Sequence, residues 1–87
     1  MTYRIELSRG AAKALLAVPS SDRRRIERAI DSLAREPRPR GAKKLIGGAG
    51  ALRLRFGSYR IIYEIIDDVL LVLVLAVGPR KDVYRQR

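Results

Sequence analysis

The chain contains no histidine and no cysteine, the side chains that most often carry acid–base and nucleophilic chemistry near neutral pH. It therefore has no thiol nucleophile, no disulfide, no catalytic pair built on histidine, and no zinc site of the usual ligands. Any chemistry must use arginine, lysine, tyrosine, aspartate or glutamate. We expect no metal and no other cofactor.

Arginine dominates the groups that remain. The 87 residues include 19 basic and 9 acidic side chains, 15 of the basic ones being arginine, which gives a net charge of +10 and a pI near 11.1. Such a charge points to a polyanionic partner, and arginine favours forked contacts to phosphate or carboxylate. The plainer alternative is a solvated basic surface that binds nothing.

A predicted hairpin organises the most informative arginines. Gly57-Ser58 separates two alternating segments, 51–56 and 59–66, and is typical of a two-residue hairpin turn. Side-chain alternation then collects the apolar residues on one face, which we expect to lie under helices. These are Leu52, Leu54, Phe56, Tyr59, Ile61, Tyr63 and Ile65.

The other face of this hairpin collects Arg53, Arg55 and Arg60. The turn places Arg55 directly opposite Arg60, and like charges in that position destabilise a sheet. Glu64 is the only nearby acid, so an anionic ligand would relieve the repulsion. Alternatively, Arg53 and Arg55 are simply the polar face of an edge strand.

A third strand, 69–77, follows a predicted two-residue turn at Asp67-Asp68. This pairing places Leu75 beside Arg60, so the chain leaves the strand near the arginines and brings Arg80 and Tyr84 toward them. The strand is apolar throughout, and we expect it to be central.

The N-terminal half predicts one strand and two helices. Tyr3–Leu7 alternates as a half-buried strand and is the expected second neighbour of 69–77, and Ser8 is an N-cap for a helix that ends before Pro19. A second helix begins with cap residues at 20–22. Its apolar face is Ile26, Ala29, Ile30, Leu33 and Ala34, and a row of Arg23, Glu27, Asp31 and Arg35 reads as an ion-paired stripe.

The segment 36–50 is predicted as a connecting loop rich in proline, glycine and basic residues. Its basic residues are Arg38, Arg40, Lys43 and Lys44. Together, the predicted elements indicate one α+β domain over 1–87, with two N-terminal helices packed on one face of a mostly antiparallel four-stranded sheet. The longest apolar run is 69–77, far short of the roughly 20 residues of a membrane helix, so we expect a cytoplasmic protein.

Two segments carry a resemblance to a known family. Leu-Arg-Leu-Arg-Phe-Gly-Ser-Tyr-Arg-Ile-Ile-Tyr-Glu-Ile at 52–65 and Gly-Pro-Arg-Lys-Asp-Val-Tyr-Arg at 78–85 resemble the RelE/ParE superfamily of toxins, on its RelE side. The N-terminal strand, the Ala-rich first helix and the Glu-Pro-Arg-Pro-Arg-Gly-Ala-Lys-Lys-Leu loop follow the same order.

The resemblance implies a toxin of a type II toxin–antitoxin system with a RelE-like microbial ribonuclease fold. Such a toxin enters the ribosomal A site and cuts messenger RNA there, when the RNA 2′-hydroxyl attacks the adjacent phosphate. It is a monomer alone and forms a hetero-oligomer with an acidic, RelB-like antitoxin. The implied catalytic residues are Arg53, Arg55, Arg60, Arg80 and Tyr84, and those contacting messenger RNA or 16S ribosomal RNA are Arg38, Arg40, Lys43, Lys44 and Lys81.

This chain departs from its better-studied relatives, which carry lysines where it has Arg53 and Arg55. An arginine keeps its proton, so these two side chains are expected to clamp phosphate, and Tyr84 becomes the best candidate for proton transfer. In its plainer role, Tyr84 would only pack at the sheet edge. Two other functions stay open: a ParE-like toxin that inhibits DNA gyrase by protein contact, and a catalytically silent RNA-binding relative.

Overall fold

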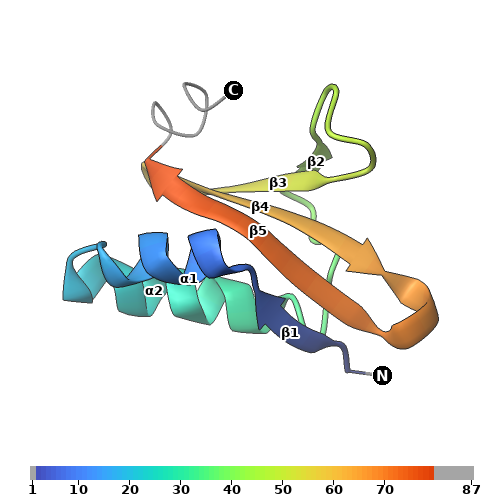
Figure 1. The fold of residues 1–87 in the computed structure, drawn as a ribbon, viewed down its shortest axis with the longest axis horizontal. Helices are drawn as coiled ribbons and strands as arrows, with labels where there is room; N and C mark the ends of the chain where they lie inside the picture. The colour runs from blue at the N-terminus through green and yellow to red at the C-terminus, as the bar shows by residue number, and fades with distance from the viewer. Residues whose placement is uncertain (1, 80–87) are drawn as a thin grey trace.

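The computed structural model describes residues 2–79, which form two layers: a twisted sheet and a pair of helices on one of its faces (Figure 1). The elements are β1 (Arg4–Leu7), α1 (Arg9–Leu16), α2 (Ser20–Ser32), β2 (Ala42–Lys44), β3 (Leu52–Phe56), β4 (Tyr59–Ile66), the 3₁₀ turn η1 (Asp67–Val69) and β5 (Leu71–Pro79). The predicted α+β class is confirmed. Neither helix within these residues is long and apolar enough to cross a membrane.

The sheet has five strands in the order β1-β5-β4-β3-β2, one more than predicted. The strand β5 is parallel to β1 and antiparallel to β4, so its predicted position between two neighbours is confirmed. The additional strand, β2, pairs antiparallel with β3 inside the segment predicted as a loop. Its sequence, Ala-Lys-Lys, is too short and too polar to carry a strand pattern.

Ser8 joins α1 to the central strand. Its Oγ accepts a hydrogen bond from the backbone N–H of Ala11 at 3.1 Å, which confirms the predicted N-cap. The same hydroxyl donates to the carbonyl of Leu75 at 3.0 Å. Leu75 is the extra residue of a β-bulge, because Ile62 pairs with Ala76 while Tyr63 pairs with Val74. One hydroxyl thus caps the helix and satisfies a carbonyl of the bulge.

We therefore expect Ser8→Ala to lower the free energy of unfolding by about 1–2 kcal/mol, from the lost cap and the lost carbonyl partner. Urea denaturation measures this. Ser20→Ala is the matched control, since α2 has no side-chain cap hydrogen bond and should lose less than about 0.5 kcal/mol. Equal losses in the two variants would contradict the double role of Ser8.

The helix α2 begins differently from the prediction. Its N-cap is Pro19, without a side-chain cap bond, so the predicted caps at 20–22 lie inside the helix. The predicted apolar face is confirmed by the burial of Ile26, Ile30 and Leu33. The predicted ion-paired stripe is wrong, because both ion pairs formed within residues 2–79 lie elsewhere.

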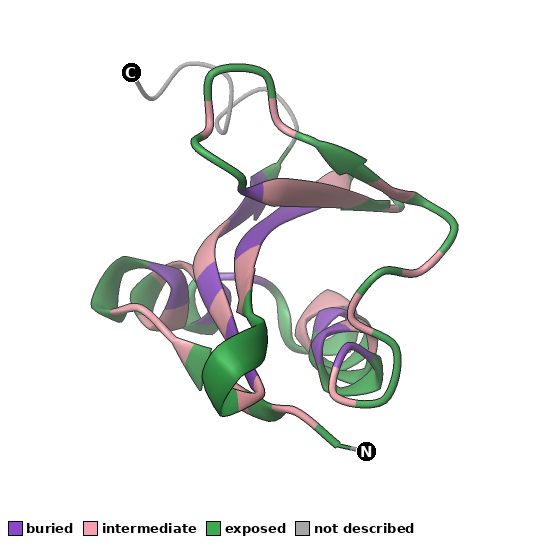
Figure 2. Ribbon diagram, turned by 90° about the vertical axis from the view of Figure 1, so that its right-hand side faces the viewer, coloured by how far each residue is buried: buried purple, intermediate pink, exposed green. Residues whose placement is uncertain are grey.

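The β3–β4 hairpin has the predicted register. Phe56 pairs with Tyr59 and Arg55 with Arg60 across a turn in which Gly57 has φ +61°, a conformation that glycine adopts without strain. The apolar face assigned to this hairpin packs against the core under the helices, as predicted. Figure 2 shows buried residues concentrated on the sheet and on the helix surfaces turned toward it.

The β4–β5 connection is longer than predicted. The 3₁₀ turn at 67–69 and Leu70, which has φ +52°, replace the expected two-residue turn, so Ile66 pairs with Leu71. The β-bulge adds a further residue of offset. Arg60 consequently lies beside Gly78, and the predicted pairing with Leu75 is wrong by three positions. The strand ends at Pro79, beyond the predicted end.

Candidate functional site

Four basic residues meet on the sheet face that points away from the helices. Arg55 pairs with Arg60 across β3 and β4, Arg53 lies two residues along β3, and Lys43 on β2 pairs with Arg53. We call these four residues the basic cluster. Its three arginines were predicted to share this face, and the register confirms that arrangement. Lys43 joins them because β2 is a strand.

The basic cluster is compact. Neighbouring strands are about 4.8 Å apart and alternate residues of one strand about 6.6 Å apart, so its backbone positions fall within roughly 12 Å. Its members differ in exposure: Arg55 is exposed, Arg53 is partly exposed, and Arg60 is only 1% exposed. Contact between Arg60 and a ligand therefore requires a change in the packing around it.

The direct opposition of two arginines distinguishes this site from an ordinary polar face. Guanidinium groups stay charged at any physiological pH, and Arg55 directly opposite Arg60 is the pairing that destabilises a ladder. Glu64 lies four residues beyond Arg60 on β4, about 13 Å along the strand. A phosphate of a bound polyanion, placed between the two arginines, would be attracted by both guanidinium groups.

The other predicted RNA-binding residues are dispersed. Arg38 binds Asp67 through Nη2 at 2.9 Å, at the end of β4 far from Arg60. Arg40 is exposed in the turn before β2. Lys44 pairs with Leu52, whose side chain packs on the core side, so Lys44 lies on the sheet face opposite Lys43. Of these four residues, only Lys43 lies in the basic cluster.

Three predicted site residues, Arg80, Lys81 and Tyr84, lie outside the described residues, and their roles stay predictions. The three described tyrosines are all held in hydrogen bonds. Tyr3 donates to Asp67 at 2.6 Å, Tyr59 to Asp22 at 3.1 Å, and Tyr63 to the carbonyl of Pro37 at 2.7 Å.

The pKa of each described tyrosine is raised. The main cause is the hydrogen bond to Asp67 for Tyr3 and desolvation by burial for the other two, and burial raises the pKa of Tyr63 to about 12. A raised pKa makes a phenol a poorer proton donor near neutral pH. None of these three hydroxyls is suited to acid–base catalysis.

Asp67 provides a pH-dependent clamp between the N-terminus, the segment after α2 and the end of β4. Hydrogen bonds from Arg38 and then from Tyr3 hold the pKa of its carboxyl below the usual 3.8. A carboxyl with a depressed pKa stabilises the fold above its unfolded pKa and loses this contribution as the pH falls through the folded value. The clamp is therefore intact at neutral pH and lost in strong acid.

Asp67→Asn should accordingly lower the melting temperature at pH 7, and the difference from the parent should shrink as the pH falls below about 4. Thermal denaturation followed by circular dichroism at several pH values measures this difference. Asp68→Asn is the control, since Asp68 forms no ion pair within residues 2–79. A constant difference between pH 7 and pH 3 would contradict the role of the Asp67 charge.

Sequence reasoning missed two contacts at this end of the sheet. Lys43 was recognised as basic, but nothing in Ala-Lys-Lys distinguished it from Lys44. Arg25 of α2 lies over the ring of Phe56, with its guanidinium carbon 5.4 Å from the ring centroid. This cation–π contact ties the hairpin to α2, and no sequence pattern links the two positions.

Comparison with known proteins agrees with this architecture. Residues 5–84 match the family model described as the ParE toxin of a type II toxin–antitoxin system. Toxin RelG of Mycobacterium tuberculosis is 38% identical over 61 residues, which are 70% of each chain. The mRNA interferase toxin RelE of Escherichia coli is 29% identical over 90 residues, covering 99% of this chain and 94% of RelE.

Solved structures give the same result. The RelBE2 toxin–antitoxin complex of M. tuberculosis contains a chain with a TM-score of 0.82 at 28% identity, covering 92% of this chain and 100% of that chain. The RelE–RelB complex of Pyrococcus horikoshii contains a chain with a TM-score of 0.79 at 34% identity, covering 92% of this chain and 97% of that chain. A mutant of E. coli RelE in the free state has a TM-score of 0.80 at 26% identity, covering 99% of this chain and 94% of that chain.

The two-layer fold with two helices on a mostly antiparallel sheet is that of the RelE structures. The chain belongs to the ParE toxin family, within the RelE/ParE superfamily, and is a toxin of a type II toxin–antitoxin system.

Proposed function

We propose that this toxin is an endoribonuclease of the RelE type, which cleaves messenger RNA in the ribosomal A site. The observation that carries the proposal is the direct pairing of Arg55 with Arg60 inside the basic cluster. A toxin that acts only through protein contact has no need of paired guanidinium groups suited to a phosphate. Relatives named mRNA interferases also support an endoribonuclease activity.

The proposed reaction is a transesterification within the RNA. The 2′-oxygen forms a bond to the adjacent phosphorus as the bond from phosphorus to the 5′-oxygen breaks. One proton leaves the 2′-hydroxyl and another reaches the departing 5′-oxygen. Negative charge builds on the phosphoryl oxygens between these events, where fixed cations stabilise it most.

Within this scheme, Arg55 and Arg60 hold the scissile phosphate. Arg55 is exposed and would meet the RNA first, whereas Arg60 would contact it once the packing around that residue opens. Arg53 extends the positive surface along β3. Neither these side chains nor Arg80 can act as a base, because a guanidinium does not release its proton in this pH range.

Lys43 is the member of the basic cluster that could exchange a proton. We expect Lys43→Ala to slow cleavage by at least about tenfold, because it removes either a phosphate contact or a proton-transfer group beside Arg53. Lys44→Ala is the matched control, since it removes the same charge from the opposite face of the same strand. Its rate should stay within about twofold of the parent. Equal effects would show that only the overall charge of β2 matters.

We also propose that an acidic antitoxin neutralises the toxin by covering the basic cluster. The net charge of +10 would accelerate association with such a partner. Structures of relatives described as RelB–RelE complexes support this partner. Co-expression with the adjacent reading frame should yield a complex more soluble than the toxin alone, and a pull-down that recovers no acidic protein would count against it.

Mapping the 5′ ends of messenger RNA after induction tests the cleavage proposal. New ends at defined codon positions, present only on translated messages, are expected. A second function, inhibition of DNA gyrase, is favoured by the match to the ParE family model. Loss of supercoiling activity by purified gyrase, without new RNA ends, would establish that function and exclude the endoribonuclease.

A further inference from the structure

The turn end of the β3–β4 hairpin has less support from neighbouring strands than the rest of the hairpin. Within residues 2–79, β2 pairs with β3 only as far as Leu54, so the last two residues of β3 extend beyond it. On the other side, Tyr59 lies opposite Pro79, which has no N–H to donate to β4. The pair formed by Arg55 and Arg60, on which the proposed function depends, lies at this end.

The helix α2 contacts this end of the hairpin through two side chains. Phe56 and Tyr59 form the last pair before the turn, and both meet residues in the first two turns of α2. The Tyr59 hydroxyl donates to Oδ2 of Asp22 at 3.1 Å, and the guanidinium carbon of Arg25 lies 5.4 Å from the ring centroid of Phe56. Asp22 and Arg25 are three residues apart and so share one side of the helix. Figure 1 shows the start of α2 at the same end of the molecule as the end of β5, which pairs with Tyr59.

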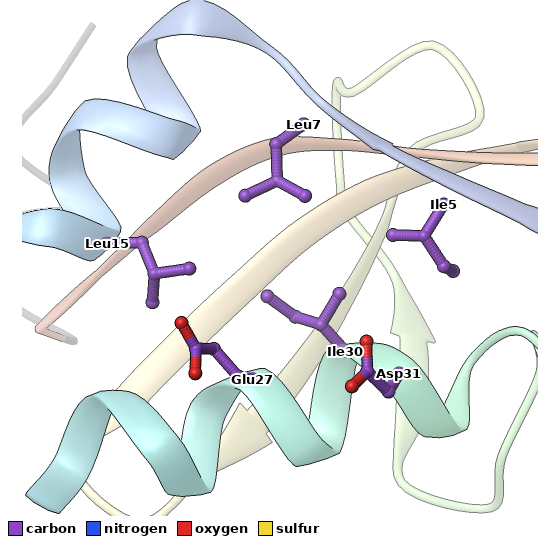
Figure 3. Close-up of a pocket in the computed structure, with 6 residues that line it drawn as sticks. All are labelled: Ile5, Leu7, Leu15, Glu27, Ile30 and Asp31. Atoms are coloured by element: carbon purple, nitrogen blue, oxygen red, sulfur yellow. The ribbon is translucent and has the colours of Figure 1, made fainter.

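On its side toward α1 and β1, α2 is less constrained, because a cavity of about 390 Å³ lies between the three elements. Its lining consists of Ile5, Leu7, Leu15, Glu27, Ile30 and Asp31. Figure 3 shows side chains of the three elements facing one another across this space. Close packing fixes one element against another, and the cavity interrupts that packing. The two contacts at the start of α2 therefore contribute more to the placement of helix and hairpin.

We propose that Asp22 and Arg25 are positioning residues for the arginine pair of the proposed phosphate site. Their contacts hold the two residues that close the turn, and Arg55 and Arg60 lie one residue farther along each strand. A two-stranded ribbon twists more than a wide sheet, so fixing its end fixes the relative direction of the two arginines. Fixed cations stabilise developing charge only when they are aimed at it, and a misplacement of about 1 Å can cost up to about 10²-fold in rate.

This inference rests on the proposed endoribonuclease function and adds to it two residues that act without touching RNA. Both contacts lie on the helix side of the sheet, since Phe56 and Tyr59 pack against the core, whereas the basic cluster occupies the opposite face. Substitutions at these contacts therefore leave the charges of the basic cluster in place. Any effect on cleavage must pass through the hairpin.

Tyr59→Phe tests the first contact, because it removes the hydroxyl bound to Asp22 and keeps the ring. We expect the maximal rate of single-turnover cleavage on programmed ribosomes to fall about tenfold, with the half-saturating toxin concentration unchanged. Tyr63→Phe is the matched control. It removes a hydroxyl four residues farther along the same strand, which donates to the carbonyl of Pro37 at 2.7 Å. It should lose at least as much stability and keep the parental rate.

Arg25→Met tests the second contact, because it removes the cation and keeps much of the aliphatic chain over Phe56. We expect the maximal rate to fall about three- to fivefold, the range of a cation–π contact at an exposed site. Arg25→Lys, which keeps a cation over the ring, should restore the rate to within about twofold of the parent. Arg28→Met is the control for charge, since Arg28 forms no ion pair or cation–π contact within residues 2–79.

Coupling to Arg55 separates positioning from a general loss of stability. In an Arg55→Ala background, Tyr59→Phe should slow cleavage by less than about twofold, because the pair that it positions is already incomplete. Binding of a 2′-O-methyl tetranucleotide, which cannot react, is measured for the same variants by fluorescence anisotropy. Tyr59→Phe should weaken this binding about threefold in the parent and not at all in Arg55→Ala.

The binding measurement decides the inference even if the parent does not cleave RNA, a result that would refute only the proposed function. It also serves where Arg55→Ala cleaves too slowly to follow. Additive effects in the Arg55→Ala background, equal rates for Tyr59→Phe and Tyr63→Phe, or no recovery in Arg25→Lys would each overturn the proposal.

Discussion

Arg55→Ala is expected to lower the rate of messenger RNA cleavage by about 10²- to 10³-fold, the usual cost of removing one fixed group that stabilises transition-state charge. Growth arrest on induction should disappear with it. Arg55 is exposed and lies opposite Arg60 on the neighbouring strand, so the substitution leaves no cavity in the core. We expect the melting temperature to stay close to that of the parent.

Arg60 needs a different substitution because its side chain is buried. Alanine would leave a cavity, and any loss of activity could then reflect a weakened fold. Arg60→Met keeps most of the side-chain length while removing the charge, so it avoids most of the cavity that alanine would leave. We expect Arg60→Met to fold and to lose activity as Arg55→Ala does.

Arg35→Ala is the control for both variants, because it removes one exposed arginine from the turn after α2, outside the basic cluster. It should arrest growth as the parent does. Single-turnover cleavage on programmed ribosomes, with melting temperatures measured in parallel, compares the three proteins. A folded Arg55→Ala or Arg60→Met protein that retains full activity would show that these two residues do not hold the phosphate.

The β3–β4 hairpin shows how much the sequence could predict. Gly57-Ser58 determines a two-residue turn, and the turn determines the register, so the opposition of Arg55 and Arg60 followed from local chemistry alone. The apolar faces of β4 and α2 could be predicted in the same way. Apolar residues recur with a period of 2 in the strand and of 3.6 in the helix.

Features that depend on tertiary contact could not be predicted. The bulge at Leu75 exists where the Ser8 hydroxyl receives its carbonyl, a contact between residues 67 positions apart. The strand β2 forms by pairing with the edge of β3, and the sequence Ala-Lys-Lys has no pattern that predicts a strand. Both features bear on the candidate site: the bulge contributes to placing Gly78 beside Arg60, and β2 brings Lys43 beside Arg53.

The burial of Arg60 was also beyond sequence reasoning. Alternation assigns a side chain to a face of a sheet, but it does not say what else packs on that face. Arg55 and Arg60 occupy equivalent positions on neighbouring strands, yet one is exposed and the other 1% exposed. The two arginines are therefore expected to differ in when they meet RNA, although the sequence presents them as a symmetrical pair.

Tyr84 is the remaining candidate for proton transfer. The chain has four tyrosines, and the three described ones hold their protons more tightly than a free phenol, with the pKa of Tyr63 raised to about 12. With no histidine or cysteine, and with three arginines in the basic cluster, the predicted site residues left to move a proton are Tyr84 and the lysines, of which Lys43 lies in the basic cluster. A ring at position 84 could instead stack on a base.

Phenylalanine separates these two roles because it keeps the ring and removes the hydroxyl. Loss of a general acid or base lowers a rate by about 10²- to 10⁴-fold, so Tyr84→Phe should be nearly inactive in single-turnover cleavage on programmed ribosomes. If the ring only stacks, a contribution of about 1–3 kcal/mol would survive in Tyr84→Phe and be lost in Tyr84→Ala. We expect the two variants to lose activity equally, which would exclude stacking as the main role. A loss under about threefold in Tyr84→Phe would exclude proton transfer through this hydroxyl and leave Lys43 as the group to examine.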